Sequence, residues 1–232
     1  MDATYLRELV SGLQADHEQG ESPGGRLCRA CVDLLAVGSA GIMLMDEEGN
    51  GTSLGLSDGV IRVVEDLQFT LGEGPGIDAH AQGRPVLEPR LGNPAADRWP
   101  TFAPAAVDAG VQAGFGFPLH VGAISLGSLD LYQPRPGPLN DTQMADAISM
   151  ADFIARAVIT IQAGADPGEL VAEMTNPRDL RTQVHQASGM ISEQLGVGIG
   201  DALIRLRAYA YAEGHPIDEV ARDVVDRRLK LP

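Results

Sequence analysis

The spacing of apolar residues divides the chain into helical and extended segments. Near the N-terminus, apolar residues recur three or four positions apart, which predicts one helix over residues 2–19 and a second that runs to Val37. The pattern then becomes extended. A Gly-Asn-Gly turn signal at residues 49–51 separates the apolar runs Ala40–Asp46 and Thr52–Leu56, so these residues form a predicted β-hairpin.

The middle of the chain continues with short elements of both kinds. Val60–Phe69 fits a helix or a strand, and a loop of alternating glycines follows it at Leu71–Gly76. The other expected elements are a helix at Ile77–Gln82, a strand at Val86–Leu91, a short helix within Asp97–Gly110, and strands at Val111–Val121 and Ile124–Tyr132. Three or four antiparallel strands flanked by helices predict an α+β domain.

A long helix is predicted from Asn140 onward. One apolar seam runs along it, formed by Ala147, Ala151, Ile154, Val158 and Ile161. These spacings are typical of helices that pair along their length, so we favour a homodimer in which this seam meets a second copy. The alternative is that the seam packs on the sheet of its own domain.

The C-terminal part carries only helical signals. Apolar residues mark three short helices, the first ended by Gly196 and the second by Gly214. The predicted organisation is an α+β domain at residues 1–164, a linker at 165–176 and an all-α three-helix domain at 177–232.

Charge is distributed unevenly between these two parts. The chain has 17 Lys and Arg against 32 Asp and Glu, a formal charge of -15. From Asn176 onward eight basic residues balance eight acidic ones, so the first 175 residues carry the whole excess. This asymmetry suggests two modules with different partners, although a chance distribution of charge would produce the same numbers.

Several kinds of chemistry are excluded or disfavoured. Lys230 is the only lysine, so the chain has neither a P-loop lysine nor a plausible Schiff-base lysine. Cys28 and Cys31 form a single C-x-x-C without the second pair that a zinc site needs, and we favour two half-buried helix thiols over a redox pair. We expect no enzyme activity, no metal site, no membrane span, and a cytoplasmic location.

Three blocks of the C-terminal part resemble the ANTAR domain, an RNA-binding three-helix module of bacterial antitermination regulators. The blocks are Val184–Ile191, Asp201–Ala212 and Pro216–Val225. The resemblance implies a hairpin-RNA partner, although many members of that family have lysine where this chain has Ser188. The candidate RNA-binding residues are Gln186, Ser188, Gly189, Arg205, Arg207, Tyr211 and His215.

Two of these candidates share a helical face, because Arg207 and Tyr211 are four residues apart. Arg207 offers a hydrogen-bonding fork and Tyr211 a stacking surface, which are the groups that recognise unpaired bases. The alternative reading places the tyrosines in the three-helix core and makes Gly189 a close contact between helices.

The first domain resembles the GAF domain, a sensory fold that binds small ligands. The likeness rests on Leu71–Gly76, on Gly83–Val86, and on the strands Phe115–Leu119 and Gly127–Tyr132. Candidate ligand-binding residues are Arg98, Trp99, Phe102 and Phe115. Trp99 is equally compatible with a position in the core. The sequence leaves the cofactor and the identity of the ligand unknown.

Together, these features predict a signal-responsive RNA-binding regulator of transcription antitermination. One alternative is a DNA-binding regulator with a GAF sensor, and another is a GAF-type redox sensor or enzyme that uses Cys28 and Cys31. The charge asymmetry adds a hypothesis about regulation. If the acidic domain docks against Arg205 or Arg207, it shields the RNA-binding face.

Overall fold

The computed structural model describes residues 22–46, 51–93, 98–162 and 182–231. The helix expected at residues 2–19 lies outside this part. The described residues between 22 and 162, called the sheet domain here, contain five helices and five strands. In chain order these are α2 Pro23–Leu35, β1 Ser39–Met45, β2 Gly51–Leu56, α3 Gly59–Leu71, α4 Pro75–Gln82, β3 Val86–Glu88, α5 Phe102–Asp108, β4 Ala113–Val121, β5 Ile124–Gln133 and α6 Asp141–Gln162.

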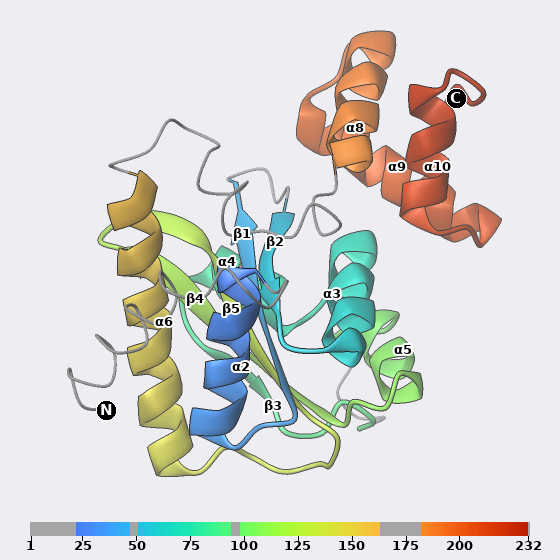
Figure 1. Cartoon of the computed structure of the whole chain (residues 1–232). Coiled ribbons are helices and arrows are strands. Elements are labelled where there is room, and N and C mark those ends of the chain that lie inside the picture. The colour runs from blue at the N-terminus through green and yellow to red at the C-terminus, as the bar shows by residue number, and fades with distance from the viewer. Residues whose placement is uncertain (1–21, 47–50, 94–97, 163–181, 232) are drawn as a thin grey trace.

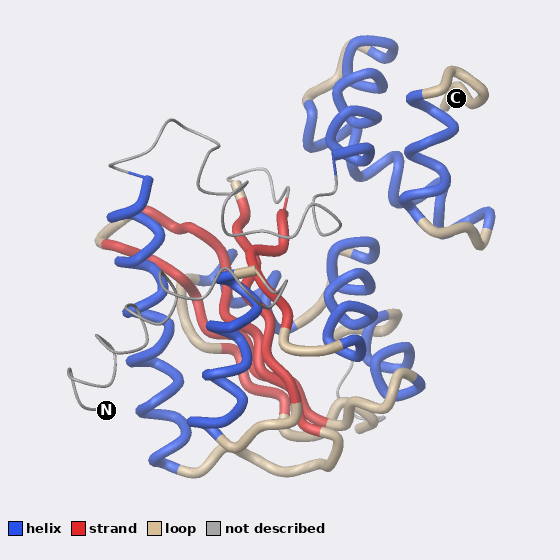
Figure 2. The backbone as a smooth tube through the Cα atoms, viewed as in Figure 1, coloured by secondary structure: helices blue, strands red, loops and turns tan. Residues whose placement is uncertain are grey.

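The five strands form one antiparallel sheet in the order β2-β1-β5-β4-β3, with β5 at its centre (Figure 2). The ambiguous segment Val60–Phe69 is helical and lies within α3. The Asp58 carboxylate explains its start, because it accepts hydrogen bonds from the backbone N–H groups of Val60 and Ile61. Strand β3 is shorter than the predicted Val86–Leu91, since Pro89 has no N–H with which to continue the ladder.

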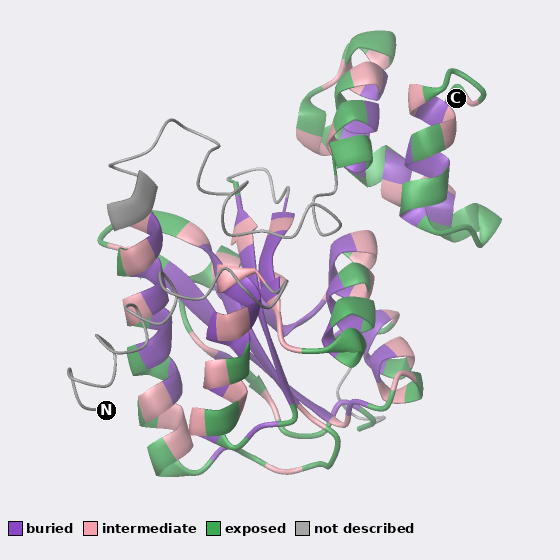
Figure 3. Ribbon diagram, viewed as in Figure 1, coloured by how far each residue is buried: buried purple, intermediate pink, exposed green. Residues whose placement is uncertain are grey.

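Helices cover both faces of the sheet (Figure 1). On one face, α2 and α6 pack on the apolar side chains of β1, β4 and β5 to form the larger core. On the other face, α3, α4 and α5 enclose a second core around Trp99, Phe102 and Tyr132. Figure 3 shows the sheet buried between these two layers.

The apolar seam of α6 faces the sheet of its own domain. Ala147, Ala151, Ile154 and Val158 are buried in the same core as Phe115 and Phe117 of β4. The favoured interpretation, in which the seam pairs with a second copy, is therefore wrong. The spacing of apolar residues predicts that one face of a helix is buried, but it does not predict which surface covers that face. Here β4 covers the apolar face of α6. The expectation of a homodimer loses the surface on which it rested.

The two cysteines lie on the inner face of α2. Cys28 and Cys31 are both free thiols and fully buried, rather than half-buried as expected. Burial raises the pKa of the Cys28 thiol well above its ordinary value, and raises that of Cys31 to about 12. Because the thiolate is the reactive form, this environment suits core packing rather than redox chemistry.

Three helices follow the sheet domain: α8 Thr182–Leu195, α9 Ile199–Glu213 and α10 Ile217–Val225. We call residues 182–231 the three-helix bundle. Its helices share one apolar core, which includes Val184, Ile191, Leu203, Leu206 and Val220. Gly196 and Gly214 follow α8 and α9 with positive φ, a conformation that ends a helix readily when the residue is glycine.

The burial of the α6 seam makes a testable prediction about stability. Ile154→Asp places a charge where the native side chain is 0% exposed, so we expect the free energy of unfolding to fall by several kcal/mol. Ile148→Asp on the same helix is the control, because Ile148 is 44% exposed. Urea denaturation measures both variants. A stable Ile154→Asp protein that merely dissociates from dimer to monomer in light scattering would contradict the packing.

Candidate functional site

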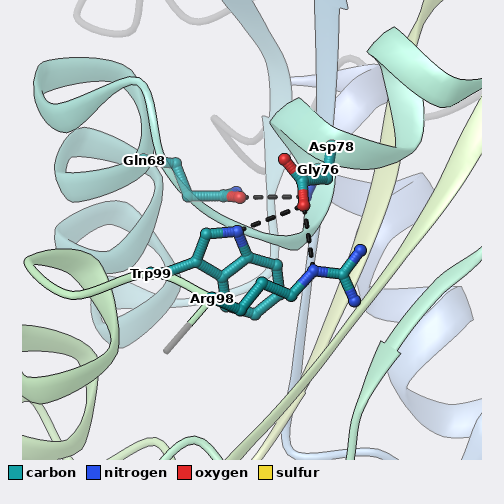
Figure 4. Close-up of polar contacts among 5 residues, drawn as sticks. All are labelled: Gln68, Gly76, Asp78, Arg98 and Trp99. Atoms are coloured by element: carbon teal, nitrogen blue, oxygen red, sulfur yellow. Dashed lines mark hydrogen bonds and ion pairs between the residues drawn. The ribbon is translucent and has the colours of Figure 1, made fainter. Parts of the chain in front are cut away.

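A buried polar network joins α3, α4 and β5 behind the glycine-rich loop. The Gln68 side-chain amide donates hydrogen bonds of 3.1 Å to both Glu65 Oε2 and Asp130 Oδ2. Its carbonyl oxygen accepts a bond of 2.9 Å from the Gly76 backbone N–H, as Figure 4 shows. Only glycine fits at position 76, because a Cβ there would lie within contact distance of both Asp130 carboxylate oxygens. The glycine loop thus packs directly on a buried acid.

Asp130 is the most perturbed acid of this network. Its complete burial raises the pKa of the carboxyl group from 3.8 to about 6, while hydrogen bonds from Gln68, Ser128 and Glu65 oppose that rise. The Gln68 amide bridges the Glu65 and Asp130 carboxyl groups, so two buried acids lie close together in the interior of the domain.

A small cavity lies next to this pair. Its volume is about 10 Å³, which is room for about one water molecule. The lining residues are Met43, Met45, Gly51, Glu65, Gln68, Phe69 and Ile77. Flexible methionines and one aromatic ring make up most of its apolar wall, so the cavity can enlarge only if these side chains move.

The predicted ligand-binding residues are only partly brought together. Arg98 and Trp99 both bond to Asp78 Oδ2, at 3.1 and 3.3 Å, and the guanidinium group lies 5.1 Å from the centre of the Trp99 ring (Figure 4). Phe102 packs edge-on against Trp99. Phe115 lies in the other core, beneath α2 and α6, and so is not part of this group.

Most of that group belongs to the core rather than to an open site. Trp99 and Phe102 are buried, and Glu73 Oε2 accepts hydrogen bonds of 2.9 Å from the backbone N–H groups of Thr101 and Phe102. The acids of the glycine loop and α4 therefore anchor the loop that carries Trp99. A groove of about 340 Å³ borders Trp99 on the α5 side.

The structure also brings together a serine and a histidine that the sequence analysis did not pair. Ser125 Oγ lies 2.8 Å from His80 Nδ1, and His80 Nε2 lies 3.3 Å from the Asp46 carbonyl oxygen. The residues are 45 positions apart in the chain, so local spacing carries no signal for the pair. Neither side chain lines any of the cavities described here, and we assign the pair to holding the β4–β5 hairpin against α4.

A further hollow lies on the three-helix bundle, between α8 and the residues at and after the end of α10. This groove, called the α8–α10 groove, has a volume of about 570 Å³. It is lined by Gln186, Gly189, Met190, Glu193, Gln194, Val224, Arg227, Leu229 and Lys230. Two of the predicted RNA-binding residues, Gln186 and Gly189, therefore face two cations that the sequence analysis did not single out.

Gly189 leaves part of this groove open. A Cβ built at this position would meet nothing within 4 Å, so Gly189 is not the close contact between helices that was the alternative reading. Arg227 and Lys230 are exposed, whereas Arg228 bonds to both Asp223 and Asp226 at 2.8 Å. Arg227 and Lys230 lie beyond the recognised sequence blocks, and only the fold brings them to Gly189.

The other predicted RNA-binding residues lie in different surroundings. Arg205, His215 and Tyr211 are exposed, the last at 65%, so Tyr211 is not a core residue. Ser188 is buried, and its hydroxyl group donates a hydrogen bond to the Val184 carbonyl oxygen, which keeps Ser188 off the surface.

Arg207 is half-buried, with its guanidinium carbon 4.8 Å from the centre of the Phe69 ring of α3. It therefore does not share a free face with Tyr211.

The five-stranded sheet, its covering helices and the glycine loop agree with a match of residues 25–158 to the GAF domain family. The chain belongs to the GAF domain family. The sheet domain is its GAF domain, and the matched region ends before the three-helix bundle. Among curated proteins, none matches the chain.

Solved GAF domains share this fold at low sequence identity. One is the GAF domain of a phosphoenolpyruvate-protein phosphotransferase from Acinetobacter, with 13% identity and a TM-score of 0.51 over 71% of this chain and 98% of the other. Another, from a phosphoenolpyruvate-protein phosphotransferase of Coxiella burnetii, has 15% identity and a TM-score of 0.50 over 69% and 94% of the two chains. These similarities establish the fold alone.

No described helix is both long enough and apolar enough to span a membrane. Within the same part of the chain, no three His, Cys, Asp or Glu side chains come together in a way that would hold a metal ion.

The raised pKa of Asp130 makes stability depend on pH. Between about pH 4 and pH 6 the folded state keeps a proton that the unfolded chain releases, so the free energy of unfolding falls as pH rises through this window. Asp130→Asn removes this contribution and should flatten the profile, which urea denaturation at several pH values measures. An unchanged slope in the variant would show that Asp130 is not the group responsible.

Proposed function

We propose that this chain is a signal-responsive RNA-binding regulator of transcription antitermination. In this proposal the GAF domain senses a signal, and the three-helix bundle binds hairpin RNA in the cytoplasm. The resemblance of the bundle to the ANTAR domain suggests the class of regulator. The observation that carries the proposal is the α8–α10 groove, where an open glycine faces two exposed cations.

The groove combines the features that a folded RNA requires. Arg227 and Lys230 supply positive charge for phosphates, and the Gln186 amide offers both a donor and an acceptor. Because Gly189 carries no side chain, an RNA backbone can approach α8 closely there. Glu193 also lines the groove and disfavours phosphate near its own end. The groove therefore has one side suited to the RNA backbone.

Exposed residues of α9 add groups for base recognition. Arg205, Tyr211 and His215 are all exposed, and sequence-specific RNA binding relies on stacking and hydrogen bonding to unpaired bases. Tyr211 suits stacking, because its ring is largely in solvent and belongs to no core. A hairpin loop presents such bases, whereas a DNA duplex hides them.

The role of the GAF domain in this proposal is to bind a small molecule and report it. The cavity beside Glu65 and Gln68 is the site we favour, because it combines flexible apolar walls with buried polar groups. It is too small for an organic ligand as it stands. Binding therefore requires its walls to move.

The proposed function predicts a specific change in salt dependence. Arg227→Ala and Lys230→Ala should each weaken hairpin-RNA binding and lower the slope of log affinity against log salt by about 0.7, the value for one phosphate contact on a single strand. Fluorescence anisotropy of the full chain across salt concentrations measures this. Arg228→Ala is the matched control, since Asp223 and Asp226 already hold that guanidinium group.

Two results would contradict this proposal. Equal losses in all three variants would show a diffuse charge effect rather than a groove. Tighter binding to duplex DNA than to hairpin RNA would instead favour the DNA-binding alternative.

Gly189 provides a second prediction, in which stability and function change in opposite directions. Gly189→Leu replaces the poorest non-proline helix former in a position with free space, so the free energy of unfolding should rise by about 1 kcal/mol. The same side chain fills the α8–α10 groove and should weaken RNA binding at least tenfold. Urea denaturation and anisotropy measure the two effects. Unchanged RNA affinity in the stabilised variant would exclude Gly189 from the RNA-binding surface.

A further inference from the structure

Two of the contacts between the three-helix bundle and the GAF domain come from different helices of the bundle. At the first, the guanidinium group of Arg207 on α9 lies over the Phe69 ring on α3, 4.8 Å from its centre. At the second, His185 Nε2 on α8 lies 3.4 Å from Thr52 Oγ1 on β2. These contacts also reach two different elements of the GAF domain, α3 and β2. The bundle therefore rests against the GAF domain in this arrangement.

Phe69 is the residue that belongs to both domains. It projects from α3 of the GAF domain, yet it packs in the apolar core of the three-helix bundle and is only 2% exposed. It also lines the small cavity together with Glu65 and Gln68. One side chain is thus a wall of the cavity and the support for Arg207.

Docking also covers part of the proposed RNA-binding surface. Arg207 is a candidate RNA-binding residue, and in this arrangement it is half-buried against α3. The first 175 residues carry the whole excess of negative charge, so docking holds α9 beside an acidic domain. Negative charge near the bundle lowers the local concentration of RNA.

We propose that the docked arrangement is an autoinhibited state and that Phe69 couples it to the cavity. A molecule larger than water can enter the cavity only if its walls move. Movement of Phe69 removes the support for Arg207, and the bundle then leaves the GAF domain with α9 uncovered. The docked and undocked forms are two states in equilibrium, and ligand binding shifts that equilibrium toward the undocked form. This proposal rests on the proposed RNA-binding function.

The test uses variants on the GAF side, because Arg207 itself belongs to the proposed RNA-binding surface. Phe69→Leu keeps an apolar side chain but removes the ring beneath Arg207, and Thr52→Val removes the hydroxyl group that faces His185. Phe117→Leu is the matched control, since it makes the same change in the core beneath α2 and α6, away from the bundle. Anisotropy gives the affinity for hairpin RNA, and small-angle X-ray scattering gives the radius of gyration.

We expect Phe69→Leu and Thr52→Val each to raise RNA affinity at least threefold and to increase the radius of gyration, while Phe117→Leu changes neither. Unchanged or lower RNA affinity in Phe69→Leu and Thr52→Val would overturn autoinhibition. If no form of the chain binds RNA, the proposed function fails. The radius of gyration then tests the docking of the bundle by itself. Expansion in both variants supports the two docking contacts, and an unchanged radius overturns them.

Discussion

The buried Asp130 carboxyl group constrains the whole face of the sheet that α3, α4 and α5 cover. It lies on the central strand without access to water, and a charge there would be costly unless nearby groups compensated for it. Gln68 and Ser128 donate hydrogen bonds to it, and the same Gln68 amide also holds Glu65. Since α3 supplies both Gln68 and Glu65, the position of α3 on the sheet is tied to this carboxyl group.

The same constraint explains the glycine-rich loop. Gln68 reaches Asp130 with its amide and Gly76 with its carbonyl oxygen, so the loop and the strand are connected through a single side chain. Any side chain at position 76 would collide with Asp130. The glycines thus serve the packing of a buried acid, and they leave the neighbouring acids Glu73 and Asp78 to anchor the Trp99 loop.

Residue patterns predicted the local elements well and the partners of those elements poorly. Turn and glycine signals located the β1–β2 hairpin, the start of α4 and the ends of α8 and α9, because backbone conformation at such positions depends on the local sequence. The α6 seam was assigned to the wrong partner, since Ile154 and Val158 have the same spacing whether they face a second copy or β4. The Ser125–His80 contact, like the position of Lys230 in the α8–α10 groove, depends on chain segments that only folding brings together.

The position of Arg207 shows why the candidate site was only partly predictable. Its spacing from Tyr211 correctly indicates neighbouring positions on α9, but a shared face of one helix does not require a shared environment. Tyr211 remains in solvent, while Arg207 lies over a ring that belongs to another domain. A contact of this kind is weak compared with a domain core, and such interfaces within a chain commonly permit relative motion. Weakness is what a reversible switch needs, because a small molecule can shift an equilibrium only by its difference in affinity for the two states.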